Sequence, residues 1–253
     1  MAERETPDLL PRALGLIEAA AAEDIPLRLV GGFAIRVLCP MFTPRIRDRQ
    51  DLDLASVSDV RRRLTDFLVE LGYEPDKRFN ALYGHKQLYF VASDGVTVDV
   101  LVDRLDMCHV LPFKDRIARM PTTLDVTDVL LSKLQIVELN EKDVQDVLYL
   151  LSAFEISDSD EPGTIGLSRF EEILRDDWGW WRTVTGNLDH IRQLATGPSA
   201  GLIPPNAERD PVEQIDALAR AARDVPKTLR WRVRSKVGER KRWYQLPEEE
   251  GHD

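Results

Sequence analysis

The chain of 253 residues has little cysteine, little histidine and no long apolar run. Two cysteines are too few for a disulfide framework or for a zinc site made of cysteines. The four histidines show no metal-ligand spacing to one another, which argues against a zinc hydrolase. No stretch approaches the roughly 18 apolar residues that span a bilayer, and the N-terminus has no apolar signal core. We therefore expect a cytoplasmic protein with no membrane contact.

The motifs of several common enzyme classes are also missing. The sequence has no Gly-x-x-x-x-Gly-Lys-Ser/Thr phosphate loop, no Gly-x-Ser-x-Gly elbow and no repeat with a period of roughly 20 to 50 residues. The apolar fraction of 43% and the charged fraction of 31% are those of an ordinary globular protein, and the length allows one or two domains. A net charge of −10 argues against broad coating of nucleic acid.

An alternation of acids and leucines, Gln50-Asp51-Leu52-Asp53-Leu54-Ala55, predicts a strand. Residues two apart in a strand point to the same side, so Asp51 and Asp53 project together while the leucines face the core. Two neighbouring carboxylates repel each other unless a positive charge lies between them. Mg²⁺ takes such oxygen ligands alongside substrate phosphates. An Asp-x-Asp alone is more often a solvated strand face, so this pattern needs support from elsewhere.

Support comes from a glycine pair that ends the preceding apolar segment. Leu29-Val30 leads into Gly31-Gly32, and a helix-like run from Phe33 to Leu38 follows. Such a turn lets the backbone approach a phosphate, with the N–H groups of the helix aimed at the anion. A lone Gly-Gly is usually a plain strand–helix turn. Taken singly, each of the two motifs is therefore a weak signal.

A β-hairpin is predicted from Lys86 to Val102, with Ser93-Asp94-Gly95 as its turn. Asp99 lies in the middle of the second strand, between two valines. If both valines are buried, Asp99 faces the other way, where it could meet the acids of the earlier strand. An Asp in the middle of a strand is unfavourable for a sheet, which favours a functional role over an exposed polar face. Asp103 is the alternative third acid if the register differs.

The glycine pair, an arginine and these acids resemble the motif of the nucleotidyltransferase superfamily of the DNA polymerase β type. The matching residues are Gly31, Gly32, Phe33, Ala34, Arg47, Asp51, Asp53 and Asp99. The sequence is most similar to a small bacterial branch that includes the AbiEii and MenT toxins and the aminoglycoside nucleotidyltransferases. The resemblance implies transfer of an NMP from an NTP, such as ATP, to an acceptor, with Mg²⁺ or Mn²⁺ as cofactor and release of pyrophosphate.

The resemblance also implies the roles of individual residues. Asp51, Asp53 and Asp99 would be the catalytic residues and the metal ligands. The nucleotide-binding residues would be Gly31, Gly32, Arg36, Arg47 and Lys133. Asp143 and Asp146 are three positions apart, hence on one helix face, and would support Lys133. On spacing alone, these last three residues would be interpreted as an ordinary ion-paired surface.

One position departs from the family pattern and keeps other functions open. Arg49 stands where the family often has Ser or Thr, two residues before the first acid. The alternatives are a nucleotide-binding module that has lost catalysis and an interaction protein in which the sheet is only a scaffold. The acceptor could be a tRNA or other RNA end, a small molecule or a protein side chain. The similarity to toxins implies a partner antitoxin as a further possibility.

We predict an α+β protein in which a small mixed β-sheet is flanked by helices and followed by an all-helical C-terminal part. The nucleotidyltransferase-like domain is predicted over residues 1–155, the helical domain over 156–246 and a disordered tail over 247–253. The basic segment, Lys227 to Arg242, contains eight Lys or Arg and one acid. It is either a solvated helix face or a contact for an acceptor such as tRNA.

Overall fold

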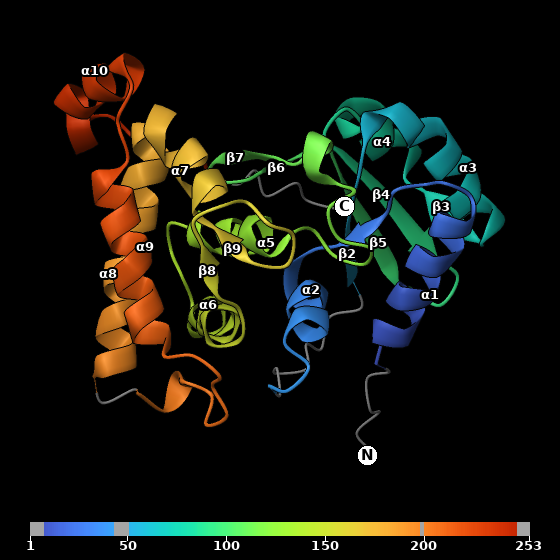
Figure 1. Ribbon diagram of the computed structural model, residues 1–253. Coiled ribbons are helices and arrows are strands. Elements are labelled where there is room, and N and C mark those ends of the chain that lie inside the picture. The colour runs from blue at the N-terminus through green and yellow to red at the C-terminus, as the bar shows by residue number, and fades with distance from the viewer. Residues whose placement is uncertain (1–7, 43–50, 198–199, 247–253) are drawn as a thin grey trace, which may run out of the picture. The chain divides into compact units, whose positions relative to one another are not determined.

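The computed structural model describes residues 8–42, 51–197 and 200–246 (Figure 1). The fold is α+β with a small mixed sheet and many helices, as the sequence predicts. Contacts divide the chain into two compact units. Unit 1 comprises Met1–Leu105 and Pro112–Leu124, and unit 2 comprises Asp106–Leu111 and Asp125–Asp253. The predicted tail, 247–253, lies outside the described residues.

Unit 1 is built on a five-stranded sheet with the strand order β1-β2-β5-β4-β3. The strands are β1 (Arg28–Leu29), β2 (Asp51–Ser56), β3 (Tyr73–Pro75), β4 (Gln87–Ala92) and β5 (Thr97–Val102). β2 and β5 run parallel, and the other three pairs are antiparallel. β4 and β5 form the predicted hairpin, whose turn residue Gly95 has a φ of 84°, in the left-handed region that favours glycine.

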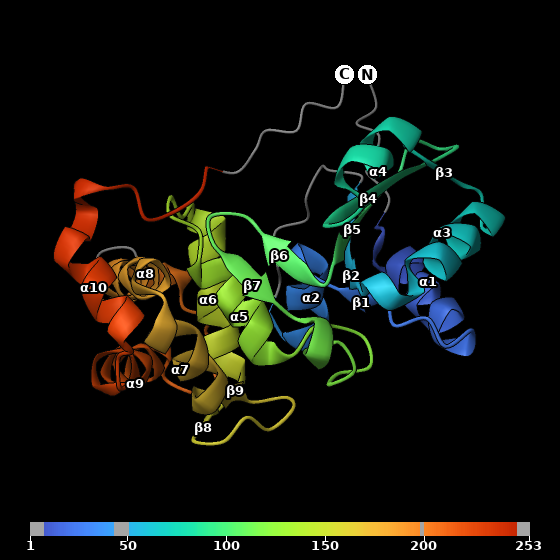
Figure 2. The ribbon, with the colours of Figure 1, turned by 90° about the horizontal axis from the view of Figure 1, so that it is seen from above.

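The alternation of burial along the strands gives the sheet two different faces. The leucines of β2 and the valines at positions 98 and 100 of β5 are fully buried, while the acids between them are only half-buried. Helices α1 (Leu10–Ala22) and α3 (Arg61–Glu70) bury their apolar stripes and lie together on one side of the sheet in both ribbon views (Figures 1 and 2). α2 (Gly31–Leu38) follows β1, and α4 (Lys77–Tyr83) precedes β4.

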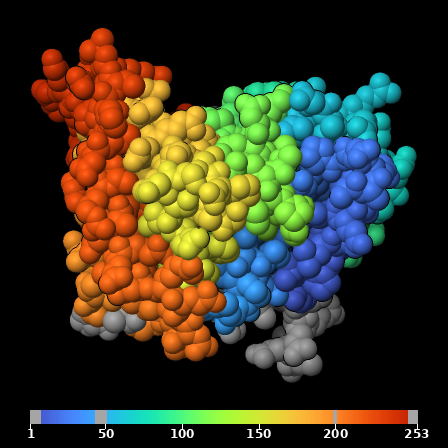
Figure 3. Space-filling view, in the orientation of Figure 1, coloured from blue at the N-terminus to red at the C-terminus, as the bar shows by residue number. Residues whose placement is uncertain are grey.

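Unit 2 is mostly helical. Its helices are α5 (Val126–Leu134), α6 (Glu141–Ala153), α7 (Leu167–Asp176), α8 (Trp178–Thr196), α9 (Pro211–Asp224) and α10 (Leu229–Val237). The parallel pair β8 (Ile156–Ser157) and β9 (Ile165–Gly166) brackets the acidic segment between α6 and α7. Unit 2 also has 3₁₀ turns at Ala200–Leu202 and Gly238–Arg240, whereas those at Ser58–Val60 and Lys114–Arg116 belong to unit 1. β6 (Arg104–Asp106) pairs with β7 (Val110–Pro112). α10 lies in the red region of the surface in the space-filling view (Figure 3).

The domain boundary predicted at residue 155 remains a prediction, and the compact units divide the chain earlier. Asn187 of α8 donates a hydrogen bond to the carbonyl oxygen of Leu134, the last residue of α5 (2.8 Å). Gln214 of α9 donates to the carbonyl oxygen of Leu151, in the last turn of α6 (2.7 Å). The last carbonyls of a helix have no partner within the helix. Asn187 of α8 therefore supplies a hydrogen-bond partner to the C-terminal end of α5, and Gln214 of α9 supplies one to the C-terminal end of α6.

Candidate active site

The half-buried face of the sheet carries the three predicted acids on neighbouring strands. The parallel register places Asp53 opposite Asp99, and Asp51 opposite Thr97. Parallel neighbours in register lie roughly 4.8 Å apart and point to the same face. The apolar residues between the acids are fully buried, so their burial turns the carboxylates to the other face. Asp51, Asp53 and Asp99 therefore share one surface of unit 1.

The glycine turn lies directly against one of these acids. Gly31 has a φ of 59°, which glycine adopts without strain. A Cβ atom at this position would lie 2.8 Å from Oδ2 of Asp53, inside van der Waals contact. The backbone N–H of Val30 donates to the carbonyl oxygen of Asp53 (3.1 Å). The first turn of α2 is thus held beside the β2 acid, and a side chain at position 31 would displace the carboxylate.

Gln87, which the sequence analysis did not single out, contacts the third acid. Its Nε2 donates a hydrogen bond to Oδ2 of Asp99 (2.7 Å). β4 is antiparallel to β5 with Tyr89 opposite Asp99, so Gln87 lies diagonally across on the same face. The sequence signal for the position of Gln87 was the alternation along β4, in which Leu88 and Phe90 are buried and Gln87 lies on the other face. Gln87 orients the Asp99 carboxylate.

The donor atoms of this face suit a hard divalent cation, because Mg²⁺ and Mn²⁺ prefer carboxylate oxygens. Within the ranges that the structure describes, no group of three or more His, Cys, Asp or Glu side chains is arranged to hold a metal ion. Gln87 holds one oxygen of Asp99, and an oxygen of Asp53 lies against the Gly31 turn. The donor types therefore fit the predicted cofactor, and a shared ion would require the carboxylates to turn toward one another.

Two predicted nucleotide-binding residues lie in α2. Gly32 follows Gly31 in the first turn of the helix. Arg36 makes a double ion pair with Asp8, with Nη1–Oδ1 and Nη2–Oδ2 distances of 2.7 and 2.9 Å. The hydrogen bonds from Arg36 lower the pKa of Asp8 to about 2. A nucleotide that binds Arg36 would have to compete with this carboxylate. Arg47, the other predicted arginine, lies outside the described residues.

Asp103, the alternative third acid, has a structural contact. Its Oδ1 accepts a hydrogen bond from the backbone N–H of Ser58 (2.8 Å), at the start of the 3₁₀ turn that follows β2. Its backbone has a φ of 64°, a conformation that side chains other than glycine, asparagine and aspartate rarely adopt. β5 ends at the residue before it. The register thus places Asp99, and not Asp103, opposite an acid of β2.

In unit 2, Lys133 of α5 lies between two acids of α6. Its Nζ is 3.2 Å from Oδ1 of Asp143 and 2.7 Å from Oδ2 of Asp146. The three side chains are 7%, 9% and 5% exposed, so two carboxylates share one ammonium in a buried cluster. The two acids share a helix face because they are three positions apart. A contact between Lys133 and a triphosphate remains a prediction.

A second buried ion pair was not foreseen from the sequence. Arg169 of α7 donates through Nε to Oδ1 of Asp128 of α5 (3.1 Å), and their side chains are 5% and 1% exposed. Nothing in the spacing of the two residues links them, because they belong to helices far apart in the chain. This pair joins α5 to α7 and lies in unit 2 with the Lys133 cluster.

His109 is a buried titratable group of unit 2. Its Nε2 lies 2.9 Å from Oγ1 of Thr183, and Nε1 of Trp243 donates to the same oxygen (3.0 Å). Burial lowers the pKa of His109 to about 4, although the charge of Asp177 acts in the opposite direction. The imidazole is therefore neutral at pH 7. The Thr183 hydroxyl, which accepts from the indole, can donate its own proton to Nε2.

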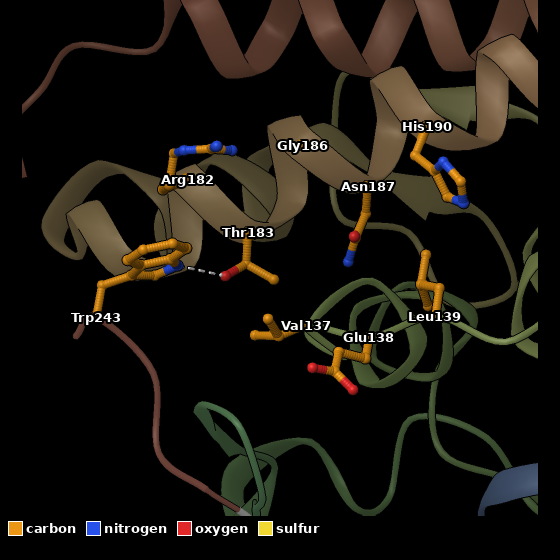
Figure 4. A pocket seen from close by; sticks show the side chains of 9 residues that line it. All are labelled: Val137, Glu138, Leu139, Arg182, Thr183, Gly186, Asn187, His190 and Trp243. Atoms are coloured by element: carbon orange, nitrogen blue, oxygen red, sulfur yellow. Dashed lines mark hydrogen bonds between the residues drawn. The ribbon is translucent and has the colours of Figure 1, made fainter. Parts of the chain in front are cut away.

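A cavity of about 400 Å³ opens beside α8 (Figure 4). Its lining comes from α8, from the segment between α5 and α6 and from the C-terminal segment: Val137, Glu138, Leu139, Arg182, Thr183, Gly186, Asn187, His190 and Trp243. Figure 4 shows the Trp243 indole joined to Thr183 at one end of the cavity. Arg182 pairs with Glu239 (2.6 Å). Of the described residues predicted to bind the nucleotide, namely Gly31, Gly32, Arg36 and Lys133, none lines this cavity.

The comparisons with known proteins give no family. The chain matches no family model and no curated protein. It is similar to the solved structure of the antibiotic-resistance factor ANT(2'')-Ia, at 14% identity and a TM-score of 0.40, over 72% of this chain and 94% of that one. It is also similar to an antigenic nucleotidyltransferase-like protein from Paracoccidioides brasiliensis, at 13% identity and a TM-score of 0.40, over 87% of this chain and 94% of that one. These values are too low for either likeness to assign an activity.

Among the described residues, none of the helices combines the length and the apolar character that a membrane crossing requires.

Proposed function

We propose that the chain is a Mg²⁺- or Mn²⁺-dependent nucleotidyltransferase that moves an NMP from an NTP to an acceptor. The observation that carries the proposal is the pairing of Asp53 with Asp99 on adjacent parallel strands, with Asp51 on the same face. The Gly31 turn lies against this acidic surface. Acids beside a glycine turn at a helix N-terminus supply both parts of such a site, the cation ligands and the phosphate-binding backbone.

The residues of this face have separate roles in the proposed reaction. Asp51, Asp53 and Asp99 would hold the divalent ions, which when bound neutralise the charge of the triphosphate. The N–H groups of the first turn of α2 bind phosphate oxygens, because they lack partners within the helix. Asp99, oriented by Gln87, accepts the proton of the acceptor hydroxyl. The acceptor oxygen then bonds to the α-phosphorus as the bond to pyrophosphate breaks.

Further contacts and the acceptor remain predictions from the resemblance. Arg36, Arg47 and Lys133 are the proposed additional contacts to the triphosphate. The acceptor is an RNA end, a small molecule or a protein side chain, and an antitoxin is a predicted partner. A tRNA contact through the basic segment was also predicted, but the exposed side chains of that segment, described below, favour a different kind of partner.

The proposal is tested by incubating the protein with each α-labelled NTP and with total RNA, lysate protein or an aminoglycoside panel. Wild type should release pyrophosphate with at least one NTP in the presence of Mg²⁺ or Mn²⁺. Asp53→Asn and Asp99→Asn should each lower the rate by roughly 10²–10³-fold, as expected for groups that stabilise charge in the transition state. Asp94→Asn is the matched control, because Asp94 lies in the turn of the same hairpin and pairs with Arg12. Equal rates in all three variants would contradict the proposed site.

A nucleotide-binding module without catalysis is the second candidate. Arg49, at a position where the family often has Ser or Thr, is the feature that favours it. Calorimetric binding of Mg·NTP by wild type without pyrophosphate release from any NTP would identify this function. If the protein neither binds NTP nor releases pyrophosphate, the remaining candidate is an interaction protein in which the sheet is only a scaffold.

A further inference from the structure

α10 is attached to unit 2 through one face. Trp231 packs edge-on against Trp181 of α8, with ring centroids 5.3 Å apart. The guanidinium of Arg234 lies over the ring of Trp178, 4.8 Å from its centroid. The side chain of Thr228 caps the helix by accepting a hydrogen bond from the N–H of Trp231. These contacts fix the rotation of α10 about its axis and so determine which residues face outward.

The outward face of α10 exposes three aliphatic side chains. Leu229, Val233 and Val237 are 76%, 58% and 40% exposed. They are four positions apart, so at roughly 100° per residue they lie within about 80° of the helix surface. Leu229 is the most exposed large hydrophobic residue of the described ranges. Isolated exposed aliphatic residues are common on proteins, but three in a line form a continuous stripe.

Cations flank this stripe on both sides. The same helical geometry places Arg232 and Lys236 on one side of it and Arg230 on the other, and all three are exposed. Glu239, the acid of the basic segment, pairs with Arg182 of α8 (2.6 Å). In the part of the chain that the structure describes, no carboxylate is within ion-pair distance of the three flanking cations. α10 is thus a strongly positive surface on a chain with a net charge of −10.

We propose that the exposed face of α10 is a docking surface for an acidic amphipathic helix of a partner protein. An apolar stripe between rows of cations is complementary to an apolar stripe between rows of Asp and Glu, as in helix pairs whose flanking charges select the partner. α10 has nine residues and is therefore about 13.5 Å long. A partner helix of roughly three turns would cover it. The proposal does not depend on nucleotidyl transfer.

The aromatic residues of the segment favour a protein partner over RNA. Single-stranded RNA binds by stacking its bases on exposed aromatic rings. Here Trp231 packs on Trp181, and Trp243 packs on Trp178 with ring centroids 6.1 Å apart. The flanking cations attract an acidic helix and a phosphate alike, whereas the residues of the stripe itself are aliphatic and offer no hydrogen bonds to base edges. Apolar side chains of a second helix are the groups that would gain from covering them.

The test measures binding of the full-length chain to a labelled synthetic helix of about 18 residues, or five turns. The peptide carries leucines along one face and glutamates beside them. A scrambled peptide of the same composition has the same charge but no stripe. The amphipathic peptide should bind at least about tenfold more tightly than the scrambled one, a difference that fluorescence anisotropy resolves readily.

Variants of α10 separate the stripe from the charge. Leu229→Asn combined with Val233→Asn should weaken peptide binding by at least about tenfold. The matched control is Val69→Asn combined with Leu82→Asn, two residues of unit 1 that are 47% and 61% exposed, and it should bind like wild type. Arg232→Gln combined with Lys236→Gln should weaken binding at low salt and flatten its salt dependence. All these side chains are exposed, so unchanged melting temperatures verify folding.

Four outcomes would overturn the proposal. Equal binding of the two peptides would mean that charge alone is sufficient for binding. Failure of the amphipathic peptide to bind would rule out an acidic amphipathic helix as the partner. Tighter binding of single-stranded RNA, unchanged in the stripe variant, would identify a nucleic-acid surface. Binding to vesicles of phosphatidylserine and phosphatidylcholine, without binding to the peptide, would identify a membrane surface.

Discussion

The acidic side chains of the two units lie in different environments. In unit 2, Asp143 and Asp146 are buried and share the ammonium of Lys133. In unit 1, Asp53 and Asp99 lie opposite each other on a half-buried sheet face, where Asp99 accepts a hydrogen bond from a neutral amide. Asp143 and Asp146 are three positions apart on a helix, and Asp51 and Asp53 are two apart on a strand. The first set is buried around the ammonium of Lys133, whereas the second lies on a half-buried face of the sheet.

This difference shows that the spacing of acids does not by itself identify a ligand site. Burial and the sign of the neighbouring charges decide whether an acidic cluster stabilises the fold or binds a ligand.

Lys133→Met should produce the largest loss of stability. It leaves Asp143 and Asp146 buried without their ammonium, and removal of one partner from a buried ion pair costs about 3–5 kcal/mol. Urea unfolding measures the change in the free energy of unfolding. The triple variant Lys133→Met, Asp143→Asn, Asp146→Asn should recover most of it, because the cluster is then neutral.

The triple variant also tests the predicted triphosphate contact of Lys133. If that contact exists, the stable triple variant should bind NTP roughly ten- to a hundredfold more weakly, as expected for a lost charge-assisted bond. Unchanged NTP affinity would show that Lys133 only stabilises unit 2. A loss of less than about 1 kcal/mol in Lys133→Met would contradict the buried ion pair itself.

His109 should make the stability of the protein depend on pH below 6.5. Its pKa is about 4 in the folded state, below the ordinary value of 6.5. The unfolded chain therefore binds the proton more readily, and the contribution of His109 to stability is lost as the pH falls from 6.5 toward 4. The loss should reach about 1–3 kcal/mol. In His109→Gln, the melting temperature should change less with pH over this range. An unchanged pH dependence would show that His109 is not the group responsible.

Gly31→Ala should destabilise unit 1 by about 1–2 kcal/mol, the cost of a left-handed backbone for a residue with a Cβ. It should also lower pyrophosphate release, because the new Cβ would displace the Asp53 carboxylate. Gly15→Ala is the matched control, since nothing lies within 4 Å of a Cβ at that position of α1. The control should keep full activity and gain up to about 1 kcal/mol from its higher helix propensity. Equal behaviour of the two variants would refute the contact between the turn and the acid.

Asp53→Asn should have the smallest effect on the free protein. Removing one of two facing carboxylates relieves repulsion, so the free energy of unfolding should stay unchanged or rise by a few tenths of a kcal/mol. The increase in melting temperature that Mg·NTP gives to wild type should be mostly lost, because that increase depends on ligand binding to the folded state. Equal ligand-induced shifts in wild type and Asp53→Asn, followed by differential scanning fluorimetry, would count against the metal site.

The sequence was sufficient to predict the elements whose pattern is local. The acid–leucine alternation predicted β2, and the Ser93-Asp94-Gly95 turn predicted the β4–β5 hairpin. Burial of the valines beside Asp99 then followed from the period of two, so the side that Asp99 faces was predictable as well. The α+β class and the helical nature of the C-terminal part also followed from such patterns.

Features that depend on tertiary packing were not predictable in the same way. α4 was missed, because Phe79 is its one buried residue and the helix is held by the side chain of Asp76, which caps its start. The hydrogen bond from Gln87 to Asp99 depends on the strand register. The burial of Lys133 depends on how α5 packs against α6, which the spacing of charges does not reveal.

The parallel pairing of β2 with β5 has a consequence for how the chain folds. In the sequence, α3, β3, α4 and β4 lie between β2 and β5, the strand that carries Asp99. β2 and β5 therefore close a long loop when they pair. Closing that loop costs chain entropy before any contact compensates for it, and two carboxylates must approach each other in the same step. Salt screens this repulsion, so refolding should be faster at high ionic strength. Asp53 and Asp99, the pair proposed to bind the catalytic cation, would thereby also limit the rate at which the sheet forms.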